Sequence, residues 1–527
     1  MHLSQLLSHI QTVSISSPVD DMTVLNIAYH SKEVNKDTLF VCIKGYQTDG
    51  HNYAEDAVSK GAVALVVEKY IAGLDVPQIL VSDSRKSLAE LSAAFYDYPS
   101  QAMRVFGITG TNGKTSITYM ADSVFSRHQL KTGVIGTVMV KINDTSRPSI
   151  LTTPESKDLQ KYLHDMEKQG VSHVSMEVSS SALELDRTAE TAFDIVAFTN
   201  INQDHIQLHG SFEAYYDAKA SLIRQASQDS IAILNADEPL LNKLVEESES
   251  NVITYGIKED NVAVKLTDID MSSGLPAFTV NIRRPLKTLD NHLIEPSAFR
   301  VQLSIPGFHS VSNAATAILA GLLNDIPVDT VIEGIEAFKG VERRFHVLYD
   351  DEFTIIDDLL LNENNIHSSL STLKYMTYNR LHLVHAIRGS NGSELNRKNA
   401  EAMIYWFNEL GIGKITLTTS QSHVKEKDQV SDEELHAFLS VMEKAGIEVE
   451  LFEELDEALK FGLDQIASND LLLITGAKGM DHGARTCLNL LKQMKPFVNY
   501  AAVDSVLKNK MVGMKDPVVP KAESCNN

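Results

Sequence analysis

Short, nearly continuous apolar segments alternate along this chain with longer stretches in which apolar positions follow a helical period. The short segments predict strands buried on both faces of a sheet, and the longer stretches predict helices that cover those faces. The apolar segments lie at 38–43, 62–67, 105–109, 171–178, 193–199, 230–234, 353–356, 381–387, 414–419, 449–452 and 471–475. Helical patterns include those at 53–60, 398–410 and 432–445. This alternation predicts α/β domains with parallel sheets.

The alternation divides into three units, and a length of 527 residues favours about three or four domains. We predict an N-terminal domain over residues 1–100, a central domain with a parallel sheet over 101–335, and a Rossmann-like C-terminal domain over 336–507. Residues 508–527 contain two prolines among Lys, Glu and Asn and have no core-forming pattern. We therefore predict that they form a mobile tail.

The strand predicted at 105–109 runs into the most informative turn of the chain, Gly110–Gly113, and then into a helical pattern that begins at Lys114. Such a turn lets backbone N–H groups cradle phosphate, Lys114 would neutralise the β- and γ-phosphates, and the Thr115 hydroxyl would bind Mg²⁺. The strict P-loop pattern has glycine where this chain has Ile108, so the match is one position short. The strand, the helix and the Gly-Lys-Thr core still favour a phosphate-binding loop over an ordinary glycine turn.

Polar clusters follow three other predicted strands of the central domain, at 176–180, 199–210 and 235–237. The carboxyl ends of parallel strands meet at one edge of a sheet, where ligands bind. Glu177 has the chemistry of a Mg²⁺ ligand, because Mg²⁺ is bound by one or two carboxylates together with phosphate and water. His205 is open to two interpretations, a metal ligand or general base and a hydrogen-bonded structural residue.

Composition narrows the class of protein. The net charge of −23 argues against a protein that neutralises nucleic-acid phosphate. The three cysteines have no paired ligand spacing, which fits a reducing compartment and predicts neither a disulfide framework nor a zinc site. The N-terminus lacks a signal-peptide layout, and no apolar run approaches the ~20 residues of a membrane span. We therefore expect a cytoplasmic enzyme with small-molecule substrates and with neither a nucleic-acid nor a membrane partner. Separately, we predict a monomer.

Together and in this order, the motifs resemble the Mur ligase family, and within it the MurE type, which adds the third residue of the peptidoglycan stem peptide to UDP-N-acetylmuramoyl-L-Ala-D-Glu. The resemblance implies a three-domain architecture with a central P-loop sheet. It also implies two Mg²⁺ ions and the catalytic residues Lys114, Glu177, His205 and Lys219. The metal ligands would be Thr115, Glu177, His205 and a carbamylated Lys219, that is, N6-carboxylysine. Without the resemblance, Lys219 would be read as a solvent-facing helix lysine.

The resemblance also assigns ligand-binding positions. Those for ATP are Gly110, Thr111, Asn112, Gly113, Lys114, Thr115, Ser116, Asn200, Asn313, Arg344 and Asp358. Those for the UDP-sugar peptide are Ser31, Gly45, Asp49, Gly50, His51, Thr152, Thr153, Ser179 and Arg187, with Lys32 where the family usually has Arg. From the residues alone, the loop at 44–51 is equally well read as a plain connecting turn. The implied reaction is ATP-driven amide formation through an acyl phosphate, with the third domain closing about a hinge near 338–342.

The third predicted domain departs from the family pattern. The family's Asp-Tyr-Ala-His motif retains only Asp358, and its His is Leu361 here. The Asp-Asn-Pro-Arg motif that reads meso-diaminopimelate is replaced by Ser420–His423, which removes the planar fork that grips a distal carboxylate. Two further motifs are replaced at 388–392 and 478–481. We predict an acceptor other than meso-diaminopimelate, with Arg388, His423, Lys478 and Asp481 as candidates to contact it.

Four interpretations of the activity follow. The first is a MurE-type ligase whose acceptor is L-lysine or another diamino or neutral amino acid. The second is a related ligase of specialised metabolism with a different carboxylate substrate, and the third is a catalytically silent relative that binds UDP-muramoyl peptide or ATP. The fourth is a folylpolyglutamate synthase. The uridine-type loops of the first domain disfavour the second and fourth, and the intact Lys114, Glu177 and Lys219 disfavour the third.

Overall fold

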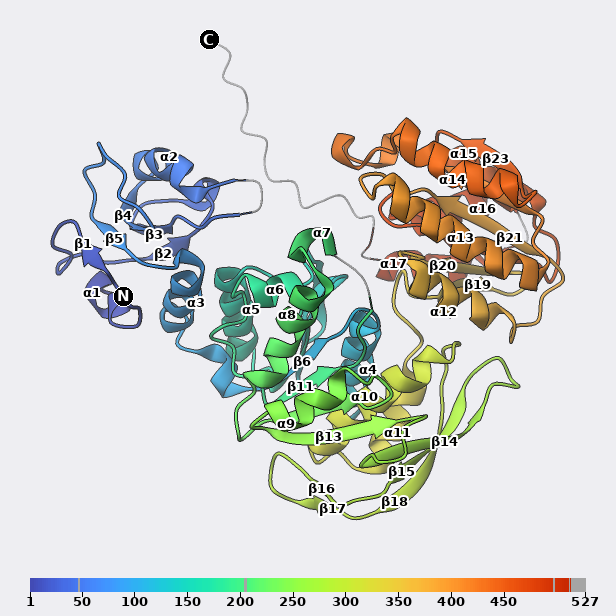
Figure 1. Cartoon of the computed structure of the whole chain (residues 1–527), viewed down its shortest axis with the longest axis horizontal. Coiled ribbons are helices and arrows are strands. Elements are labelled where there is room, and N and C mark those ends of the chain that lie inside the picture. The colour runs from blue at the N-terminus through green and yellow to red at the C-terminus, as the bar shows by residue number, and fades with distance from the viewer. Residues whose placement is uncertain (46–47, 203–205, 496–497, 511, 513–527) are drawn as a thin grey trace, which may run out of the picture.

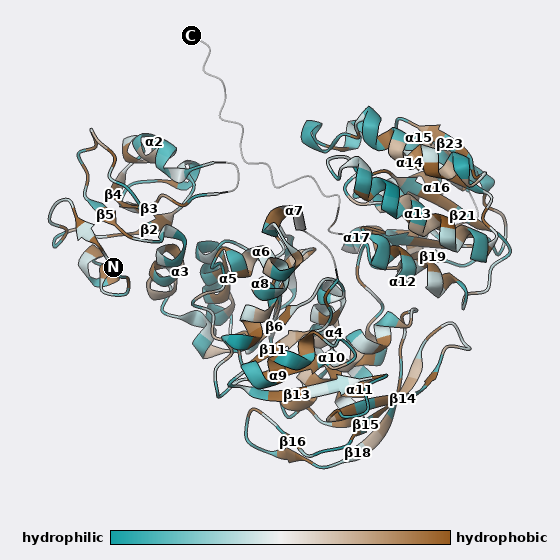
Figure 2. Cartoon of the chain, in the orientation of Figure 1, coloured by the Kyte–Doolittle hydropathy of each residue, from teal (hydrophilic) through white to brown (hydrophobic). Residues whose placement is uncertain are grey.

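A computed structural model describes residues 1–45, 48–202, 206–495, 498–510 and 512. His205 and most of the predicted tail, residues 511 and 513–527, lie outside the described residues. The chain forms three α/β lobes in sequence order, with the central lobe between the N-terminal and C-terminal ones (Figure 1). In Figure 2 the apolar colour gathers on the strands and on the helix faces turned towards them, as buried sheets require.

The N-terminal lobe is built on a five-stranded sheet in the order β1-β5-β4-β3-β2, in which the β1–β5 pair is antiparallel and the other pairs are parallel. Its strands are β1 (Ser14–Ile15), β2 (Asn26–Ala28), β3 (Thr38–Val41), β4 (Ala62–Val67) and β5 (Gln78–Leu80). Its helices are α1 (Leu3–Leu7), α2 (Ala54–Ser59) and α3 (Ser84–Phe95). The strands predicted at 38–43 and 62–67 are confirmed, and the first ends two residues early.

The central lobe contains an eleven-stranded sheet in the order β18-β15-β14-β13-β12-β11-β6-β10-β7-β8-β9. Its strands are β6 (Arg104–Thr109), β7 (Thr132–Ile135), β8 (Met139–Ile142), β9 (Thr145–Pro148), β10 (His173–Glu177), β11 (Ile195–Phe198), β12 (Ile231–Asn235), β13 (Asn251–Gly256), β14 (Val264–Asp270), β15 (Ala277–Ile282) and β18 (Ser297–Gln302). In this spatial order, the neighbouring strands β7, β10, β6, β11, β12, β13 and β14 pair in parallel. The pairs at the two edges, β7–β8–β9 and β14–β15–β18, are antiparallel. A separate hairpin joins β16 (Leu286–Lys287) to β17 (Leu293–Ile294). The parallel centre confirms the prediction, whereas the edge hairpins were not predicted.

Helices cover both faces of this sheet. They are α4 (Lys114–Arg127), α5 (Ser156–Lys168), α6 (Ser180–Glu184), α7 (Ile206–His209), α8 (Phe212–Arg224), α9 (Leu244–Glu247), α10 (His309–Leu323) and α11 (Val328–Ala337). Phe106 and Ile108 of β6 pack with α4, α10 and α11, while Val105 packs with α5 and α8 on the other face. Because side chains alternate along a strand, β6 is buried on both sides and its carboxyl end, where the predicted P-loop begins, is held rigidly.

The C-terminal lobe has a six-stranded sheet in the order β19-β20-β24-β21-β22-β23, parallel except for the β19 edge. Its strands are β19 (His346–Asp350), β20 (Thr354–Asp358), β21 (Leu381–Ala386), β22 (Lys414–Thr418), β23 (Glu448–Phe452) and β24 (Leu471–Thr475). Its helices are α12 (Glu363–Leu373), α13 (Ser393–Leu410), α14 (Asp432–Lys444), α15 (Leu455–Gln465), α16 (Gly483–Met494) and α17 (Tyr500–Asn509). All five strands predicted here are confirmed.

The predicted tail starts too early. Residues 508 and 509 belong to α17, and Lys510 is 2% exposed. The Lys510 ammonium lies 3.6 Å from a Glu342 carboxylate oxygen and 3.5 Å from one of Asp357. Buried acidic partners on distant segments order this lysine, and local composition does not reveal them. Within the described residues, no helix is both long and apolar enough to span a bilayer.

Candidate active site

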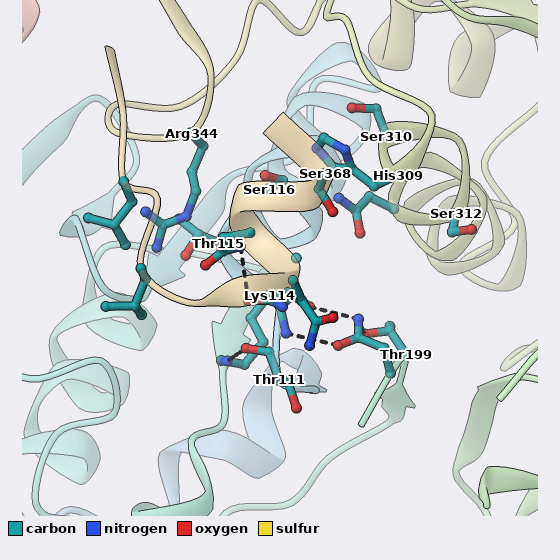
Figure 3. Close-up of a pocket in the computed structure, with 18 of the residues that line it drawn as sticks. Thr111, Lys114, Thr115, Ser116, Thr199, His309, Ser310, Ser312, Arg344 and Ser368 are labelled. Carbon is teal, nitrogen blue, oxygen red and sulfur yellow. Dashed lines mark hydrogen bonds between the residues drawn. The ribbon is translucent and has the colours of Figure 1, made fainter. Parts of the chain in front are cut away.

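The predicted phosphate-binding loop lies between β6 and α4. Gly113, which precedes α4, has a φ of +86°, and a Cβ there would overlap the Asn313 side chain on α10. Only glycine meets both conditions without strain. The Nζ of Lys114 donates to the carbonyl oxygens of Gly110 (2.8 Å) and Thr111 (3.1 Å). Figure 3 shows Lys114 between Thr111 and Thr115. The N-terminus of the 14-residue α4 faces the same space and favours anions there.

Glu177, the last residue of β10, is 1% exposed and is held by hydrogen bonds from two directions. The Thr115 hydroxyl donates to its Oε2 at 3.0 Å. The Thr137 backbone N–H donates to Oε1 at 2.7 Å, and the Thr137 hydroxyl donates to Oε2 at 3.0 Å. A Cβ on Gly136 would overlap this carboxylate, so the turn after β7 also shapes its position. The carboxylate and the two hydroxyls form a set of hard oxygen donors, which fits Mg²⁺.

Lys219 lies inside the central lobe rather than on a solvent-facing surface. It is 2% exposed, and its Nζ donates to the Gly110 carbonyl oxygen at 2.9 Å. The Nζ also lies 4.9 Å from the centre of the Tyr215 ring. Lys114 and Lys219 therefore donate to the same carbonyl oxygen, and two ammonium groups at such a site repel each other. The carbamylation of Lys219 stays a prediction, as does the metal role of His205.

A cavity of about 580 Å³ opens over the loop, between the central and C-terminal lobes. It collects most of the residues predicted to bind ATP: Thr111, Asn112, Gly113, Lys114, Thr115, Ser116, Asn200, Asn313, Arg344 and Asp358. Glu177, Thr152 and Ser179 also line it. Figure 3 shows Arg344 and Ser368 of the C-terminal part of the chain converging on the start of α4, with His309 on α10. His309, at the start of α10, also lines the cavity.

A network of asparagines links the loop to the C-terminal lobe. The Asn112 backbone N–H donates to the Asn200 side chain, which donates back to the Asn112 carbonyl, both at 2.9 Å. Asn365 of α12 donates to the Asn112 side-chain oxygen at 3.1 Å. Sequence reasoning missed Asn365 and also Thr137. A polar residue after a strand is the signal that could have found Thr137, but Thr132–Ile135 is too short an apolar segment to be recognised.

Asp358, at the end of β20, lines the cavity, but both of its carboxylate oxygens already accept hydrogen bonds from the protein. Its Oδ1 accepts from the backbone N–H groups of Phe345 (3.1 Å) and Leu359 (2.8 Å), and its Oδ2 accepts from the Ser369 hydroxyl. Burial raises the pKa of Asp358. Burial lowers the pKa of Arg344. The hydrogen bond from Phe345 ties the segment before β19 to the end of β20.

The residues predicted to bind the uridine nucleotide hold their own loop together. Asp49 caps the short 3₁₀ helix Gly50–Tyr53 by accepting from the His51 backbone N–H at 3.0 Å. The His51 ring contacts Asp49 through Nδ1 at 2.6 Å and accepts from the Glu68 backbone N–H through Nε2 at 2.9 Å. Ser31 is buried, and Gly45 turns back on Thr48. These contacts assign the residues a structural role, and their ligand role stays a prediction.

The residues predicted to bind the dipeptide gather next to Glu177. The Thr153 hydroxyl donates to the Glu177 backbone carbonyl at 2.8 Å and accepts from the Ser179 backbone N–H at 3.0 Å. Arg187 donates to the Thr153 carbonyl at 3.2 Å. Thr152 lies 3.1 Å from the Thr137 hydroxyl, on the wall of the cavity. The predicted dipeptide segments and the predicted ATP site are thus continuous.

The candidate acceptor residues lie in segments that meet at the carboxyl edge of the C-terminal sheet. The Ser420 hydroxyl donates to the Gly479 carbonyl at 2.6 Å, and the rings of His423 and His482 are 5.6 Å apart. Lys478 is ion-paired with Asp428, and Asp481 lies 3.7 Å from Arg343. The backbone carbonyl of Arg388 accepts from Asn396. None of the four candidates, all within the described ranges, lines the cavity over the phosphate-binding loop.

Comparisons with known proteins agree with this arrangement. Two family models match, the "Mur ligase family, catalytic domain" over residues 23–96 and the "Mur ligase middle domain" over residues 108–321. The UDP-N-acetylmuramoyl-L-alanyl-D-glutamate–2,6-diaminopimelate ligase of Bacillus licheniformis is 34% identical over 488 residues, which cover 90% of this chain and 94% of that protein. The protein of the same name from Alkaliphilus metalliredigens is 32% identical and covers 90% and 92%.

A solved structure of a UDP-N-acetylmuramoyl-L-alanyl-D-glutamate–2,6-diaminopimelate ligase superposes with a TM-score of 0.64 at 21% identity, covering 96% of this chain and 99% of that one. At that identity the likeness shows the three-domain fold. The curated relatives are 34% and 32% identical over nine-tenths of this chain, and this identity shows the family as well as the fold. The chain belongs to the Mur ligase family.

Proposed function

We propose that this Mur ligase uses ATP to join an amino acid to UDP-N-acetylmuramoyl-L-Ala-D-Glu in the synthesis of peptidoglycan precursors. The observation that carries the proposal is the convergence of Lys114, Thr115 and Glu177 with residues of the C-terminal lobe on one cavity of about 580 Å³. The names of the curated relatives support the same substrate. They lend no support to a ligase of specialised metabolism or to a silent binding protein.

In this reaction a substrate carboxylate oxygen attacks the γ-phosphorus in line, which breaks the bond to ADP and forms an acyl phosphate. The acceptor nitrogen then attacks the acyl carbon, an N–H proton is released, and phosphate leaves. Positioning and charge stabilisation dominate such transfers. The backbone N–H groups of the loop and the N-terminus of α4 would hold the phosphates. The Lys114 ammonium now donates hydrogen bonds to loop carbonyls. In the complex with ATP it would donate them to the phosphoryl oxygens instead.

The described residues fit a magnesium ion. Thr115 and Glu177 would hold it, because the hydroxyl oxygen of Thr115, in the first turn of α4, already lies 3.0 Å from a carboxylate oxygen of Glu177, at the end of β10. When bound, Mg²⁺ supplies neutralisation of charge on the transferring phosphoryl group. A carbamate on Lys219 would add a further anionic oxygen ligand. It would also replace the repulsion between Lys114 and Lys219 at the Gly110 carbonyl with an attraction.

For the acceptor, we propose an amino acid other than meso-diaminopimelate, although the curated relatives are named for 2,6-diaminopimelate. The reason is the replacement of the family's Asp-Asn-Pro-Arg motif by Ser420–His423 at the end of β22. In the same cluster Lys478 is ion-paired with Asp428, so its charge is already balanced. A distal carboxylate would lack the bidentate partner that arginine supplies.

The test is product formation with purified protein, ATP, Mg²⁺ and UDP-N-acetylmuramoyl-L-Ala-D-Glu, against a panel of amino acids that includes meso-diaminopimelate and L-lysine. Phosphate release and product mass are measured together, with Lys114→Ala as the inactive control. A tripeptide product with an acceptor other than diaminopimelate supports both parts of the proposal. A product only with diaminopimelate overturns the acceptor assignment, and no product with any acceptor overturns the proposed reaction.

A further inference from the structure

Glu155, the residue that precedes α5, is held between two arginines from different lobes. Its Oε2 accepts from Arg85 of α3 at 3.1 Å, and its Oε1 lies 2.9 Å from a guanidinium nitrogen of Arg187. All three side chains are shielded from solvent: Arg85 is 13% exposed, Glu155 11% and Arg187 12%. In Figure 1, α3 lies against α5 where the N-terminal and central lobes meet. A shielded, charge-assisted network therefore crosses this junction.

Each arginine is also attached to a loop that the proposed function assigns to the substrate. The Nε of Arg85 donates to the backbone carbonyl of Lys44 at 2.8 Å, at the start of the predicted nucleotide loop. Arg187 donates to the carbonyl of Thr153 at 3.2 Å, in the predicted dipeptide segment. The Glu155 carboxylate is thus the shared partner that connects the two loops. A planar guanidinium serves two acceptors at once in a fixed geometry, which lysine cannot do.

The first turn of α5 reaches a second part of the N-terminal lobe as well. The Tyr29 hydroxyl donates to Asp158 at 2.6 Å, and Lys157 donates to Glu33 at 2.9 Å. Ser31 and Lys32, which the resemblance places in the binding of the UDP-sugar peptide, lie between Tyr29 and Glu33. The start of α5 therefore contacts Tyr29 and Glu33 directly and reaches the loop at 44–51 through Arg85.

We propose that Glu155 and Arg85 are positioning residues that set the distance between the nucleotide loop and the dipeptide segment, so that one nucleoside diphosphate linked to a sugar-peptide acid engages both lobes at once. This inference rests on the proposed function. A ligand that spans two sites gains affinity because binding at the first site raises its effective concentration at the second. That gain depends on the lobes being held in the matching arrangement before the ligand arrives.

The experiment compares two ligands, UDP and UDP-N-acetylmuramoyl-L-Ala-D-Glu, by isothermal titration calorimetry on the full chain. Glu155→Gln and Arg85→Lys are measured with the wild type and with Lys86→Gln. The last is a matched control that removes one positive charge from the neighbouring, exposed position of α3. Both test variants are expected to bind the UDP-linked dipeptide at least about tenfold more weakly, with UDP affinity within about twofold of the wild type. Steady-state kinetics should show KM for the UDP-linked dipeptide rising in proportion, with kcat and KM for ATP little changed.

Equal loss of affinity for both ligands would overturn the proposal, because general damage to the junction does not distinguish them. Unchanged affinity for both, or an equal effect of Lys86→Gln, would overturn it as well. If Glu155→Gln does not fold, Arg85→Lys decides the question. The wild type tests the proposed function separately. If the wild type does not bind UDP-N-acetylmuramoyl-L-Ala-D-Glu, the proposed function itself is wrong; if it binds and the variants bind equally well, only the positioning role is wrong.

Discussion

Replacing Lys219 by glutamine is expected to remove nearly all ligase activity. The reason is the electrostatic interaction between Lys219 and Lys114, whose size follows from the structure. Lys114 and Lys219 donate to the same Gly110 carbonyl oxygen at 2.8 and 2.9 Å. Two unit positive charges that share one hydrogen-bond acceptor repel by about 3 kcal/mol at an effective dielectric constant of about 20. A carbamate on Lys219 reverses the sign of this interaction, so the two states of the lysine differ by about 6 kcal/mol in their effect on Lys114.

The assay has two readouts. Enzyme that is purified and assayed in carbon-dioxide-free buffer is expected to lose most of its activity and to regain it when bicarbonate is added. Protein equilibrated with ¹³C-bicarbonate is expected to show a carbamate signal by ¹³C NMR, and Lys219→Gln is expected to lack that signal. The variant keeps a polar side chain of similar length but cannot be carbamylated.

Three results would refute this reasoning. The first is full activity of Lys219→Gln, which would remove the residue from the site. The second is full activity of the wild type with no carbamate signal at saturating bicarbonate. The third is a carbamate signal of equal intensity in wild type and variant, which would place the modification on another amine.

Three further predictions concern the cavity and stability. Glu177→Gln keeps the size of the side chain but removes its charge, so kcat for phosphate release is expected to fall by about 100-fold or more; a value within threefold of wild type would remove Glu177 from the site. Asn365→Ala deletes the hydrogen bond to Asn112, worth about 1 kcal/mol, so KM for ATP should rise about fivefold, and an unchanged KM contradicts the contact. Burial lowers the pKa of His385 from 6.5 to about 3. The unfolded chain therefore binds more protons between these values, so the free energy of unfolding should fall as pH drops below about 6.5. Urea titrations should show a shallower pH dependence for His385→Gln, and an identical slope would exclude the histidine as a source.

Sequence patterns predicted the parts of this protein that depend on local order. The segment at 471–475 coincides with β24, and the helix that begins at Lys114 begins there in the structure. Such central strands are continuous apolar runs because helices cover both faces. The edge hairpins, such as β8 with β9, have shorter and more polar strands, so the same pattern does not mark them.

The rest of the site depends on contacts between distant segments. Asn112 and Asn365 are separated by 253 positions, and no local pattern connects them. Lys219 shows the same limit, because its helix has the composition of a surface helix while its ammonium is buried against the Gly110 carbonyl. The Lys510 contacts with Glu342 and Asp357 likewise follow from the packing of the lobes and not from the composition of the tail.

The most direct test of the proposed chemistry is the fate of oxygen in the substrate carboxylate. UDP-N-acetylmuramoyl-L-Ala-D-Glu labelled with ¹⁸O in its carboxylates is incubated with the protein, ATP, Mg²⁺ and the acceptor identified by the panel, and the released phosphate is analysed by mass spectrometry. An acyl phosphate predicts one ¹⁸O atom in each phosphate released, because the attacking carboxylate oxygen leaves with the phosphorus. Phosphate without ¹⁸O, released at the same rate, would mean that water attacks ATP directly and would contradict the proposed reaction.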